Sequence, residues 1–206
     1  MPLVEVAPID PASERPVRRG RPPKSEHRAA VLQATRELLA TEGYDALTIE
    51  AIAAESGLYR KYLHRTWPSK VALVRDAIFE DVADFVTPDL GEFGADVRAL
   101  VTQHVDLVRR PEFLVGLSSV QTALRSDPDL WDDTVIRHVK PPAKAFARLL
   151  DRAVQRGEIS DHLPPSVILN TVSGALQQLA RVGELSREEL IDHGTALVTR
   201  AMVVLR

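Results

Sequence analysis

Cationic and aromatic side chains are concentrated in residues 59–65, which contain two arginines, one lysine, one histidine and two tyrosines but no acid. Lys and Arg bind phosphate oxygens, and Arg, Tyr and His also suit base edges and thymine methyl groups. A helix that is merely solvated usually mixes charges of both signs. Either tyrosine ring could instead pack against the protein, because partly buried tyrosine is common. The sequence therefore offers six candidate nucleic-acid contacts: Tyr59, Arg60, Lys61, Tyr62, His64 and Arg65.

Two short helices joined by a tight turn are predicted to present these side chains outward. Thr48 is a suitable N-cap for the first helix, which ends at Gly57, and Pro68 prevents the second helix, 59–66, from continuing. Gly57 permits the backbone angles of a sharp turn, and the small Ala53 lets the two helices cross closely. The apolar residues that would fix the pair to a core are Ile52, Leu58 and Leu63. This is the helix-turn-helix pattern, whose second helix enters the DNA major groove, although any tight helical hairpin could mimic it.

The formal net charge of −3 conceals a basic front and an acidic remainder. Residues 1–14 carry −3, residues 15–75 carry +6 and residues 76–206 carry −6. The stretches 15–25 and 56–75 each hold five Lys or Arg and no acid. A basic end of this kind suggests a polyanionic partner, and an unevenly charged solvated surface is the alternative.

An extended arm precedes the first helix. Its residues 18–24 read Arg-Arg-Gly-Arg-Pro-Pro-Lys, which is too rich in proline for a helix and resembles the Gly-Arg-Pro core of an AT-hook. A basic arm can lie in the narrow minor groove of A·T-rich DNA, where the potential is most negative. Arg18, Arg19 and Arg21 are therefore further candidate DNA contacts, with a disordered solubilising tail as the alternative.

The whole chain predicts an all-α fold of about nine helices, because strand-like alternation is missing and apolar residues recur with helical spacing. We expect a flexible basic, Pro-rich arm over 1–24, a helix-turn-helix domain over 25–87 and a second helical domain over 88–206. Pro141-Pro142 should either kink or split a helical segment. Besides the two helices above, helices are expected from Ser25 to Gly43, after Ser69, and over 95–109, 112–125, 129–156, 165–183 and 187–205.

The sequence resembles the tetracycline-repressor (TetR) type of bacterial transcription regulators. The resemblance begins at Arg28 and is sharpest from Leu47 to Ala77, in the text ALTIEAIAAESGL followed by WPSKVALVRDAI. Farther along, LLDRAVQRGEI resembles the ligand-binding domains of one large subgroup. The resemblance implies a TetR-like fold in which residues 88–206 bind an effector and form a dimer, and a ligand-responsive regulator, by default a repressor.

The resemblance also implies individual DNA contacts. It gives Thr48 the role of capping its helix and approaching the DNA backbone, and Lys70 that of a phosphate contact. Where the family usually has a phosphate-binding Tyr, this chain has His64, and either His64 or Tyr62 could replace that contact. Glu50 would repel phosphate unless it accepts from a cytosine amino group or pairs with a neighbouring Arg.

A second copy of the chain is the expected protein partner, because one helix-turn-helix reads few bases and such modules normally work as dimers. Both C-terminal helices carry repeated apolar stripes, so more than one face needs burial. The predicted interface joins two such helix pairs around a two-fold axis, and a monomer that buries the stripes internally is the alternative. The stripes are Ile168, Val172, Ala175, Leu179 and Val182 on the first helix and Leu190, Leu197 and Ala201 on the second.

A small-molecule effector, implied by the resemblance, would bind among the C-terminal helices and release DNA. Polar or aromatic residues on otherwise apolar faces are the candidate lining residues, together with two apolar neighbours. They are His104, Phe113, Leu117, Gln121, Trp131 and His138. Each histidine could instead be a core residue whose hydrogen bonds are satisfied.

The sequence contains no recognised motif for an enzyme, a metal or cofactor site or a membrane span. The absence of cysteine excludes disulfides, a Cys nucleophile and a Cys-based zinc site. No GxGxxG, P-loop, HExxH or nucleophile-elbow motif is present, and the six histidines lack metal-ligand spacing, so no enzyme, metal or cofactor is predicted. No apolar run reaches the length of a membrane span, and we expect a cytoplasmic, nucleoid-associated bacterial protein that binds double-stranded DNA. The alternatives are an enzyme with Ser118 as nucleophile and a helical protein-interaction module with a basic face and no specific DNA site.

Overall fold

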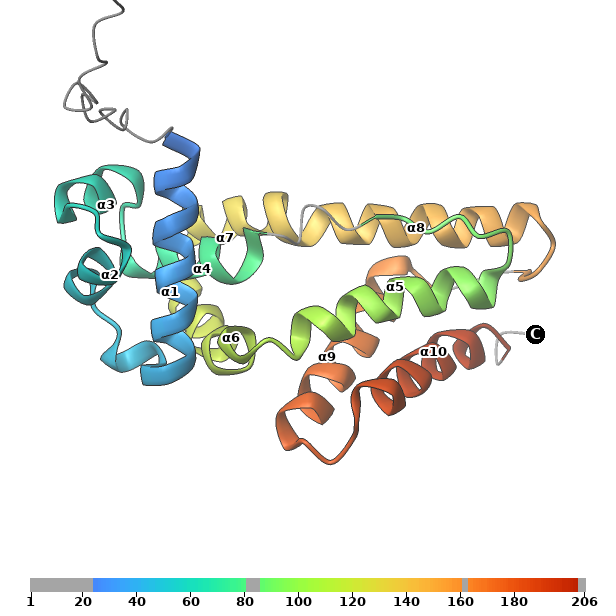
Figure 1. Ribbon diagram of the computed structural model, residues 1–206. Helices are drawn as coiled ribbons and strands as arrows, with labels where there is room; N and C mark the ends of the chain where they lie inside the picture. The colour runs from blue at the N-terminus through green and yellow to red at the C-terminus, as the bar shows by residue number, and fades with distance from the viewer. Residues whose placement is uncertain (1–23, 81–85, 161–162, 204–206) are drawn as a thin grey trace, which may run out of the picture.

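The computed structural model describes residues 24–80, 86–160 and 163–203, and all regular secondary structure within them is helical (Figure 1), which confirms the predicted all-α class. The α1–α4 unit lies at one end of the molecule, and α5, α8, α9 and α10 extend away from it (Figure 1). The elements are α1 (Lys24–Ala46), α2 (Ile49–Ser56), α3 (Arg60–Thr66), α4 (Lys70–Phe79), α5 (Phe93–Val108), α6 (Pro111–Leu124), α7 (Pro128–Thr134), the π-helix η2 (Val135–Val139), α8 (Lys140–Gln155), α9 (Pro165–Val182) and α10 (Arg187–Val203).

Side-chain caps and one glycine set the boundaries of the short N-terminal helices, as the sequence predicts. The Thr48 hydroxyl accepts a hydrogen bond from the Ala51 amide at 3.1 Å, and the Ser69 hydroxyl accepts one from the Ala72 amide at 3.2 Å. These bonds satisfy amides that would otherwise lack a partner at the starts of α2 and α4. Gly57 ends α2 with φ of 67°, a left-handed conformation that glycine adopts without strain.

The first helix differs from expectation at its start. It begins at Lys24, so Ser25 lies within the first turn and is not the residue that precedes the helix. Gly43, the predicted stop, does leave helical geometry with φ of 82°, and the residues that follow it up to Ala46 form one further turn.

The two adjacent prolines neither split the helical segment nor stop it. Helical structure runs from α7 through η2 into α8, and Pro141 and Pro142 occupy the first turn of α8. Proline has no amide to donate and its ring clashes with the carbonyl one turn earlier. The π-helical stretch Val135–Val139, in which hydrogen bonds span one more residue, is the local adjustment that precedes them.

One hydrophobic core is shared between the N-terminal helices and the helices that follow. It contains Leu32 and Leu39 of α1 and Leu73 of α4 together with Phe113 and Leu117 of α6. Helices α1 and α6 approach closely at Gly116, where an added Cβ would lie only 2.6 Å from Leu39 Cδ2. Because close-packed cores do not deform continuously, a shift of α6 must be accommodated by α1 and α4. A second core joins α5, α8, α9 and α10.

Candidate nucleic-acid interface and ligand cavity

Helix α3 presents a cationic surface to solvent. Leu63, the only apolar member of the helix, is 1% exposed and fixes α3 to the core. Tyr59, at the N-cap, is 87% exposed. The remaining outward side chains are also exposed and include no acid: Arg60, Lys61, His64 and Arg65. The helix-turn-helix pattern predicted from residues 48–66 is therefore present, with its charged face unobstructed by the rest of the described chain.

Arg60 is held by its neighbours. Its guanidinium lies 2.8 Å from a Glu50 carboxylate oxygen, and its Nε donates to His64 Nε2 at 3.0 Å. Of the two roles considered for Glu50, the structure contains the pairing with an arginine. The pair is mostly exposed, so its contribution to stability is small, and its main effect is to orient the guanidinium on the outer face.

Tyr62 differs from Tyr59 because it is half-buried. Its ring makes edge contacts with Trp67, at 6.4 Å between centroids, and with His27, at 5.6 Å. The Arg65 guanidinium lies over the same ring at 5.7 Å. These contacts favour the packing alternative for Tyr62 and leave Tyr59 as the freely exposed ring of the helix.

Lys70 has a different role from the one that the resemblance implied. Its ammonium donates to the backbone carbonyls of Tyr44 at 2.7 Å and Leu47 at 2.9 Å, and it lies 4.4 Å from the centre of the Tyr44 ring. Lys70 therefore joins the end of α1 to α4 and does not extend from the surface toward a phosphate. Thr48 remains exposed, and its O–H can still donate while its oxygen caps α2. Arg18, Arg19 and Arg21 lie outside the described residues.

A buried ion-pair network connects α3 and α4 to α7. Arg75 is 5% exposed and donates to Asp76 at 2.6 Å and to Asp133 of α7 at 2.7 Å. The other Asp76 oxygen accepts from Arg28 of α1 and from the Trp67 indole that ends α3. Burial disfavours the ionised Asp76, but the hydrogen bonds from Arg28, Arg75 and Trp67 outweigh it and lower the pKa of that carboxyl. The network is thus a charged link between the recognition helix and the C-terminal helices.

Five of the six side chains predicted to line a ligand site share one cavity of about 210 Å³. They are His104, Phe113, Leu117, Gln121 and His138. Trp131 is not among the lining residues, because it lies on a face of α7 that is turned to solvent, where the side chain is 44% exposed. The cavity also borders Phe79, the last residue of α4, so it lies between the DNA-binding unit and the C-terminal helices.

Helix α9 also contributes to this cavity, which the prediction from the sequence did not include. Asn170, Ser173 and Gln177 line it. Their spacing of three and four residues places three polar side chains on one face of α9. This pattern could have been recognised in the sequence. Phe79 had no such signal, since an aromatic residue at the end of a helical apolar stripe predicts only core packing.

Within the described part of the chain, the two cavity histidines have no hydrogen-bond partner on their buried nitrogens. These atoms are Nε2 of His104 and both ring nitrogens of His138. Burial lowers the pKa of His104 to about 4, and burial together with the nearby Arg75 lowers the pKa of His138. Both rings are therefore neutral near pH 7, each with one donor and one acceptor nitrogen. Neither histidine therefore fits the alternative of a core residue whose hydrogen bonds are satisfied by described residues.

The predicted dimer residues fall into two groups. Leu190 is 0% exposed, and Ile168 and Val172 are also buried, because α9 and α10 pack these side chains on the second core of the same protomer. Leu190 is corrected to a protomer core residue, whereas Ile168 and Val172 also line the open groove between α9 and α10 and remain predicted interface residues. Ala175, Leu179 and Leu197 are half-buried, Val182 is 53% exposed, and the side chain of Ala201 lies outside the described part.

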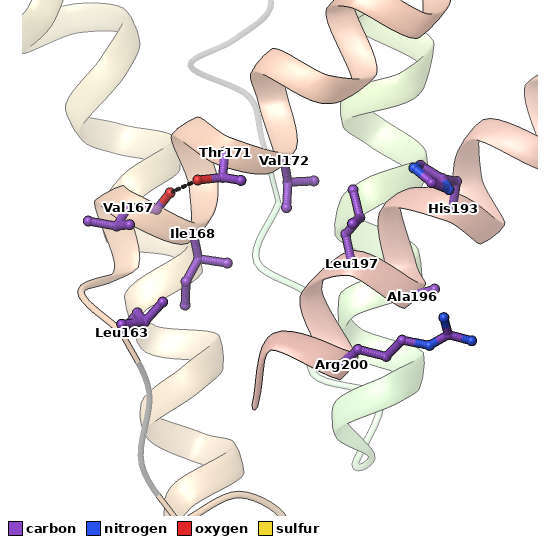
Figure 2. Close-up of a pocket in the computed structure, with 9 residues that line it drawn as sticks. All are labelled: Leu163, Val167, Ile168, Thr171, Val172, His193, Ala196, Leu197 and Arg200. Atoms are coloured by element: carbon purple, nitrogen blue, oxygen red, sulfur yellow. Dashed lines mark hydrogen bonds between the residues drawn. The ribbon is translucent and has the colours of Figure 1, made fainter. Parts of the chain in front are cut away.

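An open apolar groove runs between α9 and α10 (Figure 2). It has a volume of about 340 Å³, and in Figure 2 Ile168 of α9 and Leu197 of α10 lie on its opposite walls. The Thr171 hydroxyl is turned to its own helix, where it donates to the Val167 carbonyl at 2.8 Å. Val167 is exposed, so apolar surface remains uncovered along this edge of the protomer.

Over the described ranges, no helix is long and apolar enough to cross a membrane. The same part of the chain contains no group of three or more His, Cys, Asp or Glu side chains placed to hold a metal ion.

Comparisons with known proteins match both halves of the chain to one family. Residues 31–77 match the family described as bacterial regulatory proteins of the tetR family, and residues 87–198 match the tetracyclin repressor-like C-terminal domain. The uncharacterized HTH-type transcriptional regulator Rv1556 of Mycobacterium tuberculosis H37Rv is 30% identical over 146 residues, covering 67% of this chain and 68% of that protein. The DNA-binding transcriptional repressor TetR of Mycobacteroides abscessus is 25% identical over 170 residues, 75% of this chain and 82% of that protein.

A solved structure agrees with these matches. The TetR family transcription regulator SCO0332 has a TM-score of 0.63 and 30% sequence identity, covering 86% of this chain and 97% of that chain. The helix-turn-helix geometry, the two family matches and this structural likeness lead to one assignment. The chain belongs to the TetR family of DNA-binding bacterial transcriptional regulators.

Proposed function

We propose that this regulator is a ligand-responsive repressor that binds a pseudo-palindromic operator as a homodimer and is released by a small-molecule effector. The observation that carries the proposal is the exposed, acid-free face of α3, which the capped turn around Gly57 holds at the outer end of the molecule. Such a face combines charge for phosphate with side chains that suit base edges. A chromosomal operator places the protein in the cytoplasm, on the nucleoid.

The groove between α9 and α10 supports the homodimer. Exposed apolar surface rimmed by polar residues is typical of a protein interface, and the Ala196 side chain lies on the groove between His193 and Arg200 of the same helix (Figure 2). We infer that the same edge of a second protomer covers it around a two-fold axis. The operator half-sites would then present successive major grooves about 34–36 Å apart.

The position of the 210 Å³ cavity supports release by a ligand. It borders α4 through Phe79 and lies beside η2, which follows the α7 residues that hold Arg75. An effector that binds preferentially to a conformation in which the α3 helices are displaced from the operator would weaken DNA binding. The coupling free energy between two such sites is usually about 1–3 kcal/mol.

Selection of bound fragments from a random duplex library tests the operator and its symmetry together. We expect enrichment of an inverted repeat whose half-site centres lie about 10 base pairs apart or a multiple of that. Affinity for the selected site should fall with salt at a log–log slope of roughly −5 to −7, if each protomer neutralises about three or four phosphates.

Two results would count against the proposal in different ways. A protein-interaction module with a basic face would give no enriched sequence, and nonspecific duplex DNA would compete fully with any selected fragment. Enrichment of a single, non-repeated site would keep DNA binding but contradict the homodimer.

A further inference from the structure

We infer that the cavity between α4, η2 and α9 binds an uncharged one- or two-ring compound whose hydroxyl group exchanges hydrogen bonds with His104 and His138. This inference rests on the proposed function, because it names the chemical class of the effector that the cavity would take.

Among the described residues, the lining contains no formal charge. Its polar members are two histidines, two glutamines, one asparagine and one serine, and none of its fourteen residues is Lys, Arg, Asp or Glu. A carboxylate or ammonium group entering this space would lose its hydration without gaining an ion-pair partner, which is costly. The lining therefore selects against charged ligands.

The two imidazoles supply both kinds of hydrogen-bonding atom. His104 Nε2 and both nitrogens of His138 are buried without a partner among the residues that the structure describes, and such groups cost free energy until something satisfies them. Since each neutral ring offers one donor and one acceptor, a hydroxyl group, which donates one bond and accepts others, matches them. A ligand that only accepts or only donates would leave more of these nitrogens unsatisfied.

Aromatic side chains form the walls beside these nitrogens. His138 stacks on Phe79 with 5.3 Å between ring centres and 24° between planes, and Phe79 meets Phe113 edge-on at 5.8 Å. Flat rings pack favourably against such surfaces. A volume of about 210 Å³ corresponds to about seven water molecules, which limits the occupant to one or two rings.

A ligand in this position would contact α4 directly and would contact η2, which adjoins α7. The Arg75 network joins helices α4 and α7. Phe79 is the last residue of α4, and His138 lies four residues after Thr134, whose hydroxyl is beside Arg75. Insertion of a ring against the Phe79–His138 stack would change how α4 is held by η2 and α7.

Three naphthalene compounds with one ring system test this class on the full-length protein. We expect 2-naphthol to bind saturably in a titration calorimeter, naphthalene to bind about tenfold more weakly, and the anion 2-naphthoate to show no saturable binding at the same concentrations. His104→Phe and His138→Phe should each weaken 2-naphthol by about 2- to 13-fold, which corresponds to about 0.5–1.5 kcal/mol for one net hydrogen bond. Neither variant should weaken the binding of naphthalene. Unchanged naphthalene binding shows that the apolar cavity is intact.

Gln155→Phe is the control, because Gln155 is exposed at the end of α8 and lines neither the cavity nor the α9–α10 groove. It should bind 2-naphthol as the parent does. Binding of 2-naphthoate equal to or tighter than that of 2-naphthol would overturn the inference, as would undiminished 2-naphthol binding by a His104→Phe/His138→Phe double variant. No binding of any of the three compounds would overturn it as well.

A gel-shift assay of the same preparations on the selected operator separates this inference from the proposed function. Operator binding without any naphthol binding rejects the ligand class and leaves the DNA-binding function standing. Naphthol binding without operator binding rejects the proposed function and leaves the cavity chemistry standing.

Discussion

Arg75→Met should lower the free energy of unfolding by about 1–3 kcal/mol, because one oxygen of the buried Asp76 loses its hydrogen bonds while Arg28 still pairs with the other. Arg75 is 5% exposed and serves both Asp76 and Asp133. Methionine keeps much of the apolar stem, so the loss comes from the guanidinium and not from a cavity. Urea denaturation at a fixed protein concentration measures the change, since an oligomer makes apparent stability depend on concentration.

Two further variants identify the cause. Asp133→Asn should lower the free energy of unfolding by only about 1 kcal/mol, because Asp133 is more exposed than Asp76 and the amide oxygen still accepts a hydrogen bond. Arg75→Met combined with Asp76→Asn should recover part of the loss, since the neutral amide leaves no buried negative charge and its oxygen can still accept from Trp67 and Arg28. A loss below about 1 kcal/mol for Arg75→Met alone would show that the network contributes little.

Arg60→Ala should abolish discrimination at one operator position in each half-site, whereas Lys61→Ala should weaken binding to all sequences alike. A specific arginine contact is worth about 1–3 kcal/mol, so two copies in a dimer would cost about 2–6 kcal/mol on the selected operator. Loss of one phosphate contact per protomer should reduce the salt slope by about 2 for the dimer. Fluorescence anisotropy with the operator and with a scrambled duplex, at several salt concentrations, separates the two effects.

Glu50 supplies a necessary control for the Arg60 variant. Without Arg60, the Glu50 carboxylate that lies 2.8 Å from the guanidinium would face DNA unpaired and repel phosphate. Arg60→Ala with Glu50→Gln removes that repulsion. If the double variant regained full discrimination, the arginine would be neutralising Glu50 and not reading a base.

The sequence was sufficient for the boundaries of most helices, because they depend on local chemistry. Thr48 and Ser69 cap, Gly57 turns, and Gly183 ends α9 in left-handed geometry, where the expected helix also ended. The expected 165–183 and 187–205 helices differ by only a residue or two from α9 and α10. The choice between a kink and a split at the prolines could not be made locally, since two adjacent prolines are compatible with either and the structure accommodates them in the first turn of α8 after a π-helical stretch.

Tertiary contacts decided the roles that the sequence left open or misassigned. Lys70 is a basic residue at a helix start, and only the fold brings the Tyr44 and Leu47 carbonyls to its ammonium. Leu190 has the spacing of an interface stripe, yet the same spacing serves a protomer core. Periodicity indicates that a face is buried without indicating which partner covers it.

Cleavage of DNA from a reagent attached to α3 tests the central claim, that this helix lies against nucleotides. The chain has no cysteine, so Tyr59→Cys provides a single thiol for an iron chelate at an 87% exposed position, and Thr66→Cys provides a second at the other end of the helix. We predict cuts on the selected operator in two clusters about 10 base pairs apart or a multiple of that, displaced between the two attachment sites. Cuts no stronger than those from a chelate at the exposed Gln178→Cys, with the operator bound in both cases, would contradict the account.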